Sequence, residues 1–315
     1  MDKVIENIKR AKSVAVMAHV SEDPDAIGSC LSMAHVLETM GKNAVCYFSE
    51  AIDKTFDFLH PDYKVYPTGQ EILHDLCIVL DCGDLDRLGE RREIFTRAKR
   101  TVNIDHHYTN PGFADANYID AHASSTGEML WRLFQQMQVP IDADTARYLY
   151  LAIAADTGSF QYSNVSPETM RIAADLLEKP IDHAEIAKAL FGTESLSMMR
   201  LKADIMGHIQ SFYDGKLALI TVEQKQLKKY GVEEHSTGSL VNIPRRVEGT
   251  QIAVCLKEKD GKVKLSMRSG GEVNVAEIAE KFSGGGHKMA AGGILDCSMK
   301  EAVDRVVKAC GACIG

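Results

Sequence analysis

The chain has 315 residues, of which 45% are hydrophobic and 25% are charged, and its formal net charge is −8. A chain of this length is expected to form one large or two ordinary domains with buried cores. The negative net charge argues against a protein that wraps long nucleic acid. The sequence contains no run of about 18 apolar residues and no signal-peptide pattern, so we expect no membrane span and a cytoplasmic location.

The first half of the chain alternates strand-like and helix-like segments. Apolar runs typical of buried strands cover residues 13–19, 44–48, 76–81 and 101–105, and helical periodicity covers residues 26–41 and 145–156. Ser125 and Glu128 resemble a capping box at the start of a helix, and Ser166-Pro167 predicts another helix start. The alternation predicts an α/β fold, with a mainly parallel sheet that is flanked by helices.

The pattern changes after about residue 190. Residues 195–212 predict a helix, three strand-like segments follow at 216–222, 251–258 and 262–269, and residues 274–282 predict a further helix. The segment Lys259-Asp260-Gly261 is typical of a hairpin turn. We therefore expect a first domain over residues 1–190, a helical linker over 191–210 and a smaller α+β domain over 211–315.

Charge is distributed unevenly between these parts. Residues 1–199 hold 18 Lys and Arg against 30 Asp and Glu, a balance of −12, whereas residues 200–290 hold 15 against 11, a balance of +4. The first part is suited to bind cations and the second to bind an anion, although ordinary surface bias explains the difference equally well.

Polar residues gather where the predicted strands end, and in parallel sheets ligands bind at that edge. The residues are His19, Asp23, Asp25, Asp81, Asp105, His106 and His107, together with Asp156 at the end of a helix. Clustered carboxylates repel one another, and divalent cations relieve the repulsion. Carboxylate and imidazole ligands without thiolates favour Mn²⁺ over Ca²⁺. The pattern predicts two divalent metal ions, a centre that activates water and clamps a phosphate. Taken alone, Asp23 and Asp25, which flank Pro24 before a helix, are more typical of helix caps.

These residues lie in segments that resemble the motifs of the DHH phosphoesterase superfamily. HVSEDPDAIGS (19–29), VLDCGD (79–84), DHH (105–107) and AADTGSFQYSN (154–164) resemble its four motifs in order. SGGGHKMAAG (283–292) resembles the GGGH motif of the attached DHHA1 domain. Because both domains are represented at this length, the chain resembles the nanoRNase and pAp-phosphatase branch of the superfamily.

The resemblance implies a role for each of these residues. Six of them would ligate two metal ions: His19, Asp23, Asp25, Asp81, His106 and Asp156. Asp25 and Asp81 would be shared between the ions, Asp105 would orient a histidine, and His107 would contact the scissile phosphate. One departure from the family pattern is Glu22, where relatives often have a small residue or Asn, and we expect it to have little consequence.

A second set of candidate residues lies in the C-terminal domain. Gly284, Gly285 and Gly286 would leave backbone N–H groups open to a phosphate or a base, and His287 would stack on a base or bind a phosphate. Arg268, at the end of a predicted strand, would clamp a terminal phosphate through its planar guanidinium. A glycine run alone is also typical of a flexible turn.

The resemblance implies a bimetallic phosphodiesterase. It would hydrolyse short oligonucleotides, such as nanoRNA and linear dinucleotides, to mononucleotides, or remove the 3′-phosphate of pAp. A family-II inorganic pyrophosphatase would lack the GGGH motif, and a RecJ-like exonuclease is usually larger. A non-enzymatic nucleotide sensor would be indicated by lost metal ligands. Partners would be short oligonucleotides or nucleotide bisphosphates, without membranes or long duplexes, and relatives suggest a homodimer. The natural substrate, the cleavage polarity and the resident metal stay open.

Overall fold

The computed structural model describes residues 1–67, 73–192 and 194–314, and it describes only the backbone of His235 and His287. The chain divides into two compact units, residues 1–193 and 194–315. The division falls inside the segment that was expected to link the domains, and the limits of the linker stay a prediction. Within the described ranges, no helix has the length and hydrophobicity that a membrane span requires.

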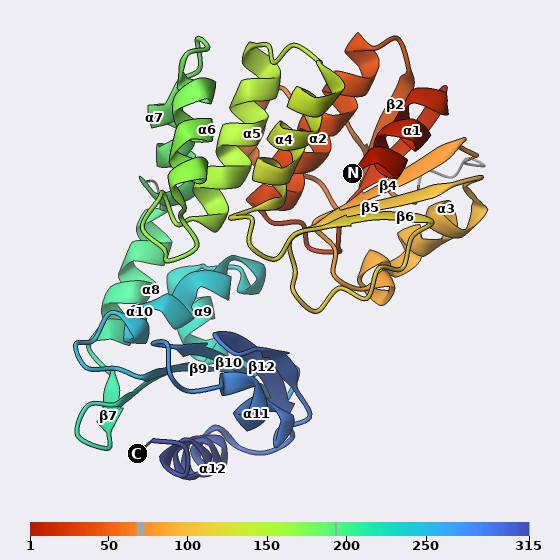
Figure 1. Ribbon diagram of the computed structural model, residues 1–315. Helices are drawn as coiled ribbons and strands as arrows, with labels where there is room; N and C mark the ends of the chain where they lie inside the picture. Colours follow the sequence, from red (N-terminus) through yellow and green to blue (C-terminus); the bar gives the residue numbers. More distant parts are fainter. Residues whose placement is uncertain (68–72, 193, 315) are drawn as a thin grey trace. The chain divides into compact units, whose positions relative to one another are not determined.

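The first unit is built on a six-stranded, wholly parallel sheet in the order β3-β2-β1-β4-β5-β6. Figure 1 labels β2, β4, β5 and β6 of this sheet. Its strands are β1 (Ser13–Met17), β2 (Asn43–Phe48), β3 (Lys64–Val65), β4 (Leu76–Leu80), β5 (Thr101–Asp105) and β6 (Ala116–Ile119). The predicted α/β fold is confirmed. The sequence did not reveal β3 and β6, because both are short edge strands with few buried residues.

Helices cover both faces of this sheet. They are α1 (Asp2–Arg10), α2 (Pro24–Thr39), α3 (Arg92–Arg97), α4 (Thr126–Met137), α5 (Ala143–Asp156), α6 (Pro167–Leu177) and α7 (His183–Ala187), with 3₁₀ turns η1 (Lys54–Leu59) and η2 (Leu85–Arg91). Side chains alternate along a strand. Accordingly, Val14 and Val16 of β1 pack into the core with α1, α2, α4, α5 and α6, whereas Ala15 and Met17 pack with η2 and α3. Burial on two faces explains why the strands read as continuous apolar runs.

The second unit contains a six-stranded mixed sheet in the order β11-β12-β10-β9-β8-β7. Its strands are β7 (Gln210–Phe212), β8 (Leu217–Val222), β9 (Ile252–Lys259), β10 (Lys262–Ser269), β11 (Gly285–His287) and β12 (Ala290–Leu295). Only the β8–β9 pair is parallel among these described strands. The predicted hairpin is confirmed: Lys259 pairs with Lys262, and Asp260 and Gly261 have φ values of 48° and 75°. Two-residue turns with positive φ match the twist of the strands.

Helices also cover both faces of the second sheet (Figure 1). They are α8 (Leu196–Met206), α9 (Gln224–Tyr230), α10 (Asn242–Arg245), α11 (Val275–Glu280) and α12 (Met299–Gly311), with the 3₁₀ turn η4 (Glu234–Val241). One core includes residues of α11 and α12, and the other includes residues of α8, α9 and α10. The helix that was expected over 195–212 ends earlier, at Met206, because residues 210–212 pair with β8 as strand β7.

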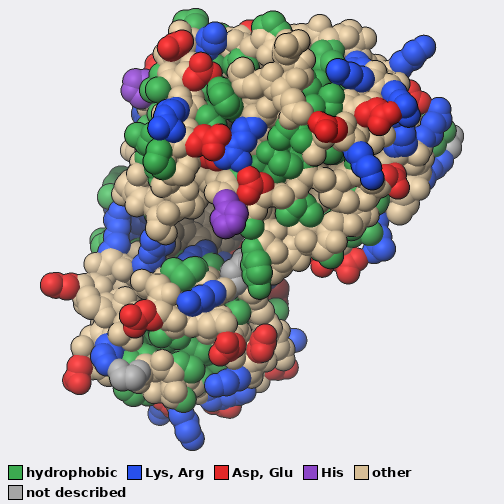
Figure 2. All heavy atoms as spheres, in the orientation of Figure 1, with side chains coloured by type: hydrophobic (Ala, Val, Ile, Leu, Met, Phe, Trp, Pro, Cys, Tyr) green, Lys and Arg blue, Asp and Glu red, His purple; other side chains and the backbone are tan. Residues whose placement is uncertain are grey.

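Acidic and basic side chains are intermixed on the visible face of both units (Figure 2). The difference in net charge between the two parts of the chain is therefore not concentrated in one patch on that face.

Candidate metal centre

The predicted ligands of the first unit lie at the carboxyl edge of its sheet. His19 follows β1, Asp81 follows β4 directly, and Asp105 is the last residue of β5. Strands β1 and β4 are neighbours, and the strand order runs away from them in opposite directions. Such a reversal opens a crevice at the carboxyl ends of the two strands. The fold therefore brings His19 and Asp81 to the place where this kind of sheet binds ligands.

Three groups of ligand atoms overlap at this edge, and each group lies within 4.8 Å: His19 with Asp23 and Asp81, Asp81 with His106 and His107, and Asp25 with His106 and Asp156. One carboxylate oxygen of Asp81 lies 3.6 Å from Nε2 of His19, and the other lies 3.4 Å from Nε2 of His106. This supports the prediction that Asp81 is shared between two ions. Asp25 occurs in only one of the groups that the described residues form.

Asp81 has an unusual backbone conformation. Its φ of 51° lies in the left-handed region, which is uncommon for a residue other than glycine. Thr126 donates a hydrogen bond from Oγ1 to Oδ1 of Asp81 at 3.1 Å. Backbone strain of about 1–3 kcal/mol at such positions is typical of functional sites, because the surrounding structure has to hold it.

Asp23 and Asp25 begin α2, and each has a structural bond as well as a place in the cluster. Oδ1 of Asp23 caps the helix by accepting from Ala26 N at 3.0 Å, while Oδ2 lies 3.6 Å from Nε2 of His19. Asp25 is fully buried and accepts hydrogen bonds from Thr126 N at 2.8 Å and Gly127 N at 3.1 Å. The helix-cap and ligand interpretations of Asp23 are therefore compatible.

The amide donors of Asp25 come from the start of α4. Ser125 caps this helix as predicted, since its Oγ accepts from Glu128 N at 3.1 Å. The other half of the predicted capping box is wrong. The Glu128 carboxylate accepts instead from Ser124 Oγ at 2.6 Å and from Thr169 Oγ1 at 2.7 Å. The amides of Thr126 and Gly127 were not recognised from the sequence, although the Ser-x-x-Glu pattern located the helix start that carries them.

The DHH segment contains a hydrogen-bonded pair, Asp105 and His107. Nδ1 of His107 lies 2.7 Å from Oδ1 of Asp105, and Oδ2 of Asp105 accepts from Asn110 Nδ2 at 2.6 Å. Asn110 also donates to Oδ1 of Asn103 at 2.7 Å, and Asn103 donates to Val79 O at 3.2 Å. Sequence reasoning missed both asparagines. The available signal was the polar Asn103 inside an otherwise apolar strand.

Mutual repulsion and attraction shift the pKa values of the cluster. Burial, followed by the charges of Asp81 and Asp156, raises the pKa of Asp25 well above its ordinary value. Burial and the charges of Asp81 and Asp23 raise the pKa of Asp156 to about 7, against the attraction of His106. Burial alone would raise the pKa of Asp81, but the imidazoles of His106 and His19, at 3.4 and 3.6 Å from its oxygens, lower it.

The two imidazoles respond in the opposite direction. Burial would lower the pKa of His19, but the carboxylates of Asp23 and Asp81, each with an oxygen 3.6 Å from Nε2, raise it to about 10. The pKa of His106 is likewise raised to about 10, since its partner Asp81 and the charge of Asp25 outweigh burial. In the absence of a cation, the carboxylates therefore favour protonated imidazoles. Carboxylates that repel one another, together with imidazole nitrogens that can donate a lone pair when neutral, are a donor set for a divalent cation. The cluster therefore fits divalent metal ions.

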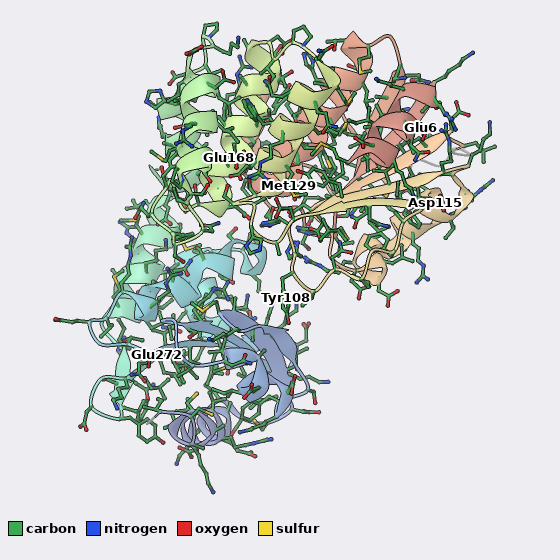
Figure 3. The ribbon with its side chains drawn as sticks, in the orientation of Figure 1. Glu6, Tyr108, Asp115, Met129, Glu168 and Glu272 are labelled. Carbon is green, nitrogen blue, oxygen red and sulfur yellow. The ribbon has the colours of Figure 1, made fainter. Side chains whose placement is uncertain are left out.

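Part of the cluster is exposed to solvent within the first unit, since the side chains of Asp23 and Asp156 are 50% and 29% exposed. Tyr108 directly follows His107, projects from the loop after β5 (Figure 3) and is 80% exposed.

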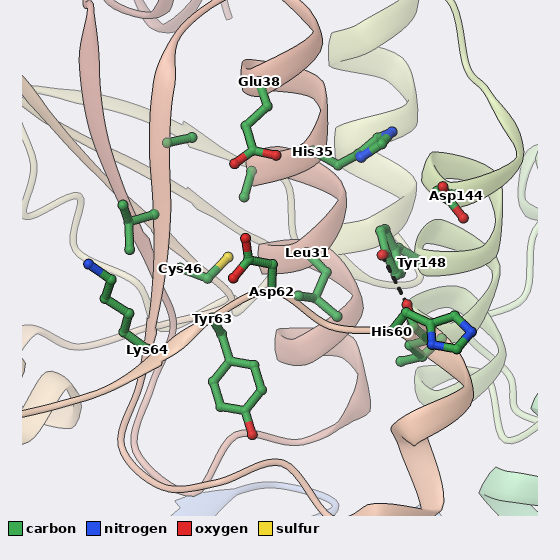
Figure 4. Close-up of a pocket in the computed structure, with 14 residues that line it drawn as sticks. Leu31, His35, Glu38, Cys46, His60, Asp62, Tyr63, Lys64, Asp144 and Tyr148 are labelled. Carbon is green, nitrogen blue, oxygen red and sulfur yellow. Dashed lines mark hydrogen bonds between the residues drawn. The ribbon is translucent and has the colours of Figure 1, made fainter.

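A separate cavity of about 310 Å³ lies beside α2, β2 and α5 (Figure 4). Residues such as His35, Glu38 and Tyr148 line it, and none of the predicted site residues is among the described residues around it.

The candidate residues of the second unit lie on adjacent strands. Ala290 of β12 pairs with Arg268 of β10 on one side and with His287 of β11 on the other. Paired residues share a face of the sheet, so the positions of Arg268 and His287 share one face. Arg268 is half-buried and donates from Nη1 to Met267 O at 2.9 Å. The side chain of His287 lies outside the described part of the structure.

The glycine run forms strand β11 and the residue before it, rather than a flexible turn. A Cβ at Gly284 would lie 2.0 Å from Gly292 O, and a Cβ at Gly286 would lie 2.5 Å from Ala290 O. Both glycines are therefore needed for close pairing with β12. Gly285, in contrast, borders open space among the described atoms.

Comparisons with known proteins cover almost the entire chain. Residues 13–153 match the model of the DHH family, N-terminal domain, and residues 214–315 match that of the DHHA1 domain. The bifunctional oligoribonuclease and PAP phosphatase NrnA of Thermus thermophilus is 31% identical, over 98% of this chain and 93% of its own length. The protein of the same name from Bacillus subtilis is 25% identical, over 92% of this chain and 91% of its own length.

A solved structure has the same fold throughout. An exopolyphosphatase-related protein from Bacteroides fragilis superposes with a TM-score of 0.92 at 28% identity, and the match covers 98% of this chain and 94% of that one.

Proposed function

Because the chain belongs to the DHH family, we propose that it is a metal-dependent phosphoesterase that hydrolyses short oligonucleotides to mononucleotides and removes the 3′-phosphate of pAp. The observation that carries the proposal is the cluster around Asp81, whose two oxygens face His19 and His106. The names of the relatives from Thermus thermophilus and Bacillus subtilis support the choice of substrates.

We infer that two divalent cations, best Mn²⁺, bind at this cluster. Their ligands would be His19, Asp23, Asp25, Asp81, His106 and Asp156. Burial and the charges of neighbouring carboxylates raise the pKa values of Asp25 and Asp156, and bound cations would stabilise the ionised forms of both groups. Bound cations would polarise the phosphate and lower the pKa of the attacking water.

His107 would act on the scissile phosphate of the substrate, and Asp105 would act through His107. Asp105 accepts the hydrogen bond of His107 at Nδ1, which fixes the tautomer and orientation of the ring. Proton exchange with the scissile phosphate or its leaving oxygen would then run through Nε2. Asn110, which donates to Asp105, would hold that carboxylate in position. We therefore propose His107 as the catalytic residue and Asp105 as its positioning residue.

We further propose that the second unit binds the nucleotide of the substrate through Arg268, Gly284, Gly285, Gly286 and His287. The shared sheet face of Arg268 and His287 supports this, and a guanidinium is well suited to a phosphate. The open space beside Gly285 makes it the glycine of the three whose backbone a ligand can approach.

The competing functions have less support. A family-II pyrophosphatase is not favoured, since residues 214–315 match the DHHA1 domain and the named relatives are alike over nearly their full length. The same coverage argues against a larger RecJ-like exonuclease. A non-enzymatic nucleotide sensor is not favoured because all six predicted ligands are present and clustered.

Partners and location follow as further proposals. We expect short oligonucleotides and nucleotide bisphosphates as partners and, from the family resemblance, a homodimer. The eight cysteines, all in described segments, are free thiols. Free thiols are typical of a reducing compartment, so we propose a cytoplasmic location.

The test compares two reactions of one preparation. Release of mononucleotides from end-labelled dinucleotides and release of phosphate from pAp are measured for wild type, Asp81→Ala and the control Asp86→Ala. The control removes a carboxylate that is 83% exposed and belongs to none of the three groups. Asp81→Ala should abolish both activities and lose at least one metal ion per chain by elemental analysis. Two ions retained by Asp81→Ala would contradict its shared role, and wild type without either activity would contradict the proposed function.

A further inference from the structure

Glu22 lies between the ligand positions His19 and Asp23, yet its carboxylate is bonded elsewhere. Its side chain is only 5% exposed. Oε1 accepts from Ser49 N at 2.8 Å and pairs with Arg91 Nη1 at 2.5 Å, and Oε2 accepts from Ser49 Oγ at 2.7 Å. Ser49 directly follows β2, so Glu22 ties the loop after β1 to the end of the neighbouring strand.

The burial of the Arg91 guanidinium beside this carboxylate has a desolvation cost. Its side chain is 1% exposed, and Nη1 also donates to Tyr47 O at 2.7 Å. Nε and Nη2 have no hydrogen-bond partner among the described residues. The desolvation of a buried ion pair costs about as much as the pairing returns, and a packed apolar pair is often as stable. A buried ion pair is therefore a poor source of net stability, and the contacts of this pair point to a role in fixing the loop.

The other residues between the two ligands, Val20 and Ser21, are also held by contacts to neighbouring segments. Val20 N donates to Arg87 O at 2.8 Å. Gly89, at φ 57°, lies so close that a Cβ there would be 2.8 Å from Cγ1 of Val20. Ser21 has a φ of 58° and donates from its N to Ser49 Oγ at 3.3 Å. Each residue from 20 to 22 thus contacts η2, which ends at Arg91, or Ser49 at the end of β2.

The loop in turn sets the positions of the two ligands. His19 Nδ1 lies 2.8 Å from Val20 O, and Asp23 is fixed as the cap of α2. Nε2 of His19 lies 3.6 Å from Oδ2 of Asp23 and 3.6 Å from Oδ2 of Asp81. A shift of the loop would change the distance between His19 and Asp23, because these two residues flank the held residues 20–22.

We propose that Glu22 and Arg91 are positioning residues for the metal centre. The pair fixes the loop so that His19 and Asp23 meet Asp81, and it engages the Glu22 carboxylate, which would otherwise compete with Asp23 for a cation. This inference rests on the proposed metal-dependent function. It gives Glu22 a role in metal binding, whereas the sequence led us to expect that this departure from the family pattern would have little consequence.

The test measures Mn²⁺ binding directly. Chelator-stripped wild type, Arg91→Met, Arg91→Lys and the double variant Glu22→Gln/Arg91→Met are titrated with Mn²⁺ by calorimetry, and thermal melting is recorded for each. The double variant removes both charges and leaves no unpaired buried ion. The matched control is Arg92→Met, which makes the same change one residue further on, in an exposed ion pair with Asp86.

We expect the double variant and Arg91→Met to bind one of two Mn²⁺ ions about tenfold or more weakly, as is typical when support for a ligand is lost. Arg91→Lys should recover part of the affinity, and Arg92→Met should match wild type. With a dinucleotide substrate, kcat should fall at limiting Mn²⁺ and recover at saturating Mn²⁺, with KM unchanged, because the pair positions ligands of the metal rather than of the substrate.

Two results would overturn the inference. One is wild-type Mn²⁺ affinity in the folded double variant, and the other is an equal loss of affinity in Arg92→Met, which would indicate a general charge effect. Failure of the proposed function looks different: wild type itself would bind no Mn²⁺ or show no turnover.

Discussion

The substitution Asp105→Asn tests the link between a buried carboxylate and the catalytic residue. Oδ1 of Asp105 lies 2.7 Å from His107 Nδ1, and Oδ2 accepts from Asn110 at 2.6 Å. An asparagine has one acceptor oxygen and one NH₂ donor, so it cannot accept from both neighbours. Either the NH₂ group faces Asn110, where two donors meet, or it faces His107 and forces the other tautomer.

The size of the effect follows from the bond that is lost. A hydrogen bond to a charged group contributes about 1.5–3 kcal/mol. If that contribution is expressed in the transition state, kcat falls by about 10-fold to 150-fold. Asp105 belongs to none of the three ligand groups of the described residues, so two metal ions should be retained.

The assay is a double-mutant cycle. Single-turnover rates on a dinucleotide are measured for wild type, Asp105→Asn, His107→Ala and the double variant, with metal content determined for each. If Asp105 acts through His107, Asp105→Asn should have almost no effect once His107 is absent. Additive losses in the double variant, or loss of a metal ion from Asp105→Asn, would refute the reasoning.

Other predictions concern the metal, the substrate and pH. Chelation should abolish turnover, and Mn²⁺ should restore it better than Mg²⁺ or Ca²⁺, because imidazole ligands suit it; full activity after chelation would contradict the metal-dependent mechanism. In a single-turnover length series, kcat/KM should fall from dinucleotides to about 10-mers, since the net charge of −8 offers no basic track for a longer strand; equal efficiency on a 20-mer would indicate an exonuclease. Arg268→Ala and His287→Ala should weaken dinucleotide turnover with metal content intact, and wild-type rates in both would remove the second unit from substrate binding. Burial lowers the pKa of His74, so below about pH 6.5 the unfolded chain binds more protons there and stability falls; urea midpoints at pH 7.5 and 5.5 should show a smaller loss in His74→Gln than in wild type.

The sequence by itself determined the elements and residues that depend on local pattern. Apolar runs located β1, β4 and β5, because strands that are buried on both faces leave little room for polar residues. The polar residues that end these runs located His19, Asp81 and Asp105, because the carboxyl ends of parallel strands meet at one edge. The hairpin at Asp260 and Gly261 was predicted from two residues, since positive φ is a local requirement.

Only the tertiary structure decided which of these residues contact one another. Glu22 contacts Ser49 and Arg91, which belong to two different segments, and the sequence around Glu22 does not predict either contact. The choice of His107 as the partner of Asp105 depends on how the chain turns after β5. Likewise, the short edge strands β3 and β6 exist because a neighbouring strand offers hydrogen bonds. Contacts between distant residues depend on the strand order, which brings β1 beside β4, and a one-dimensional pattern does not encode that order locally.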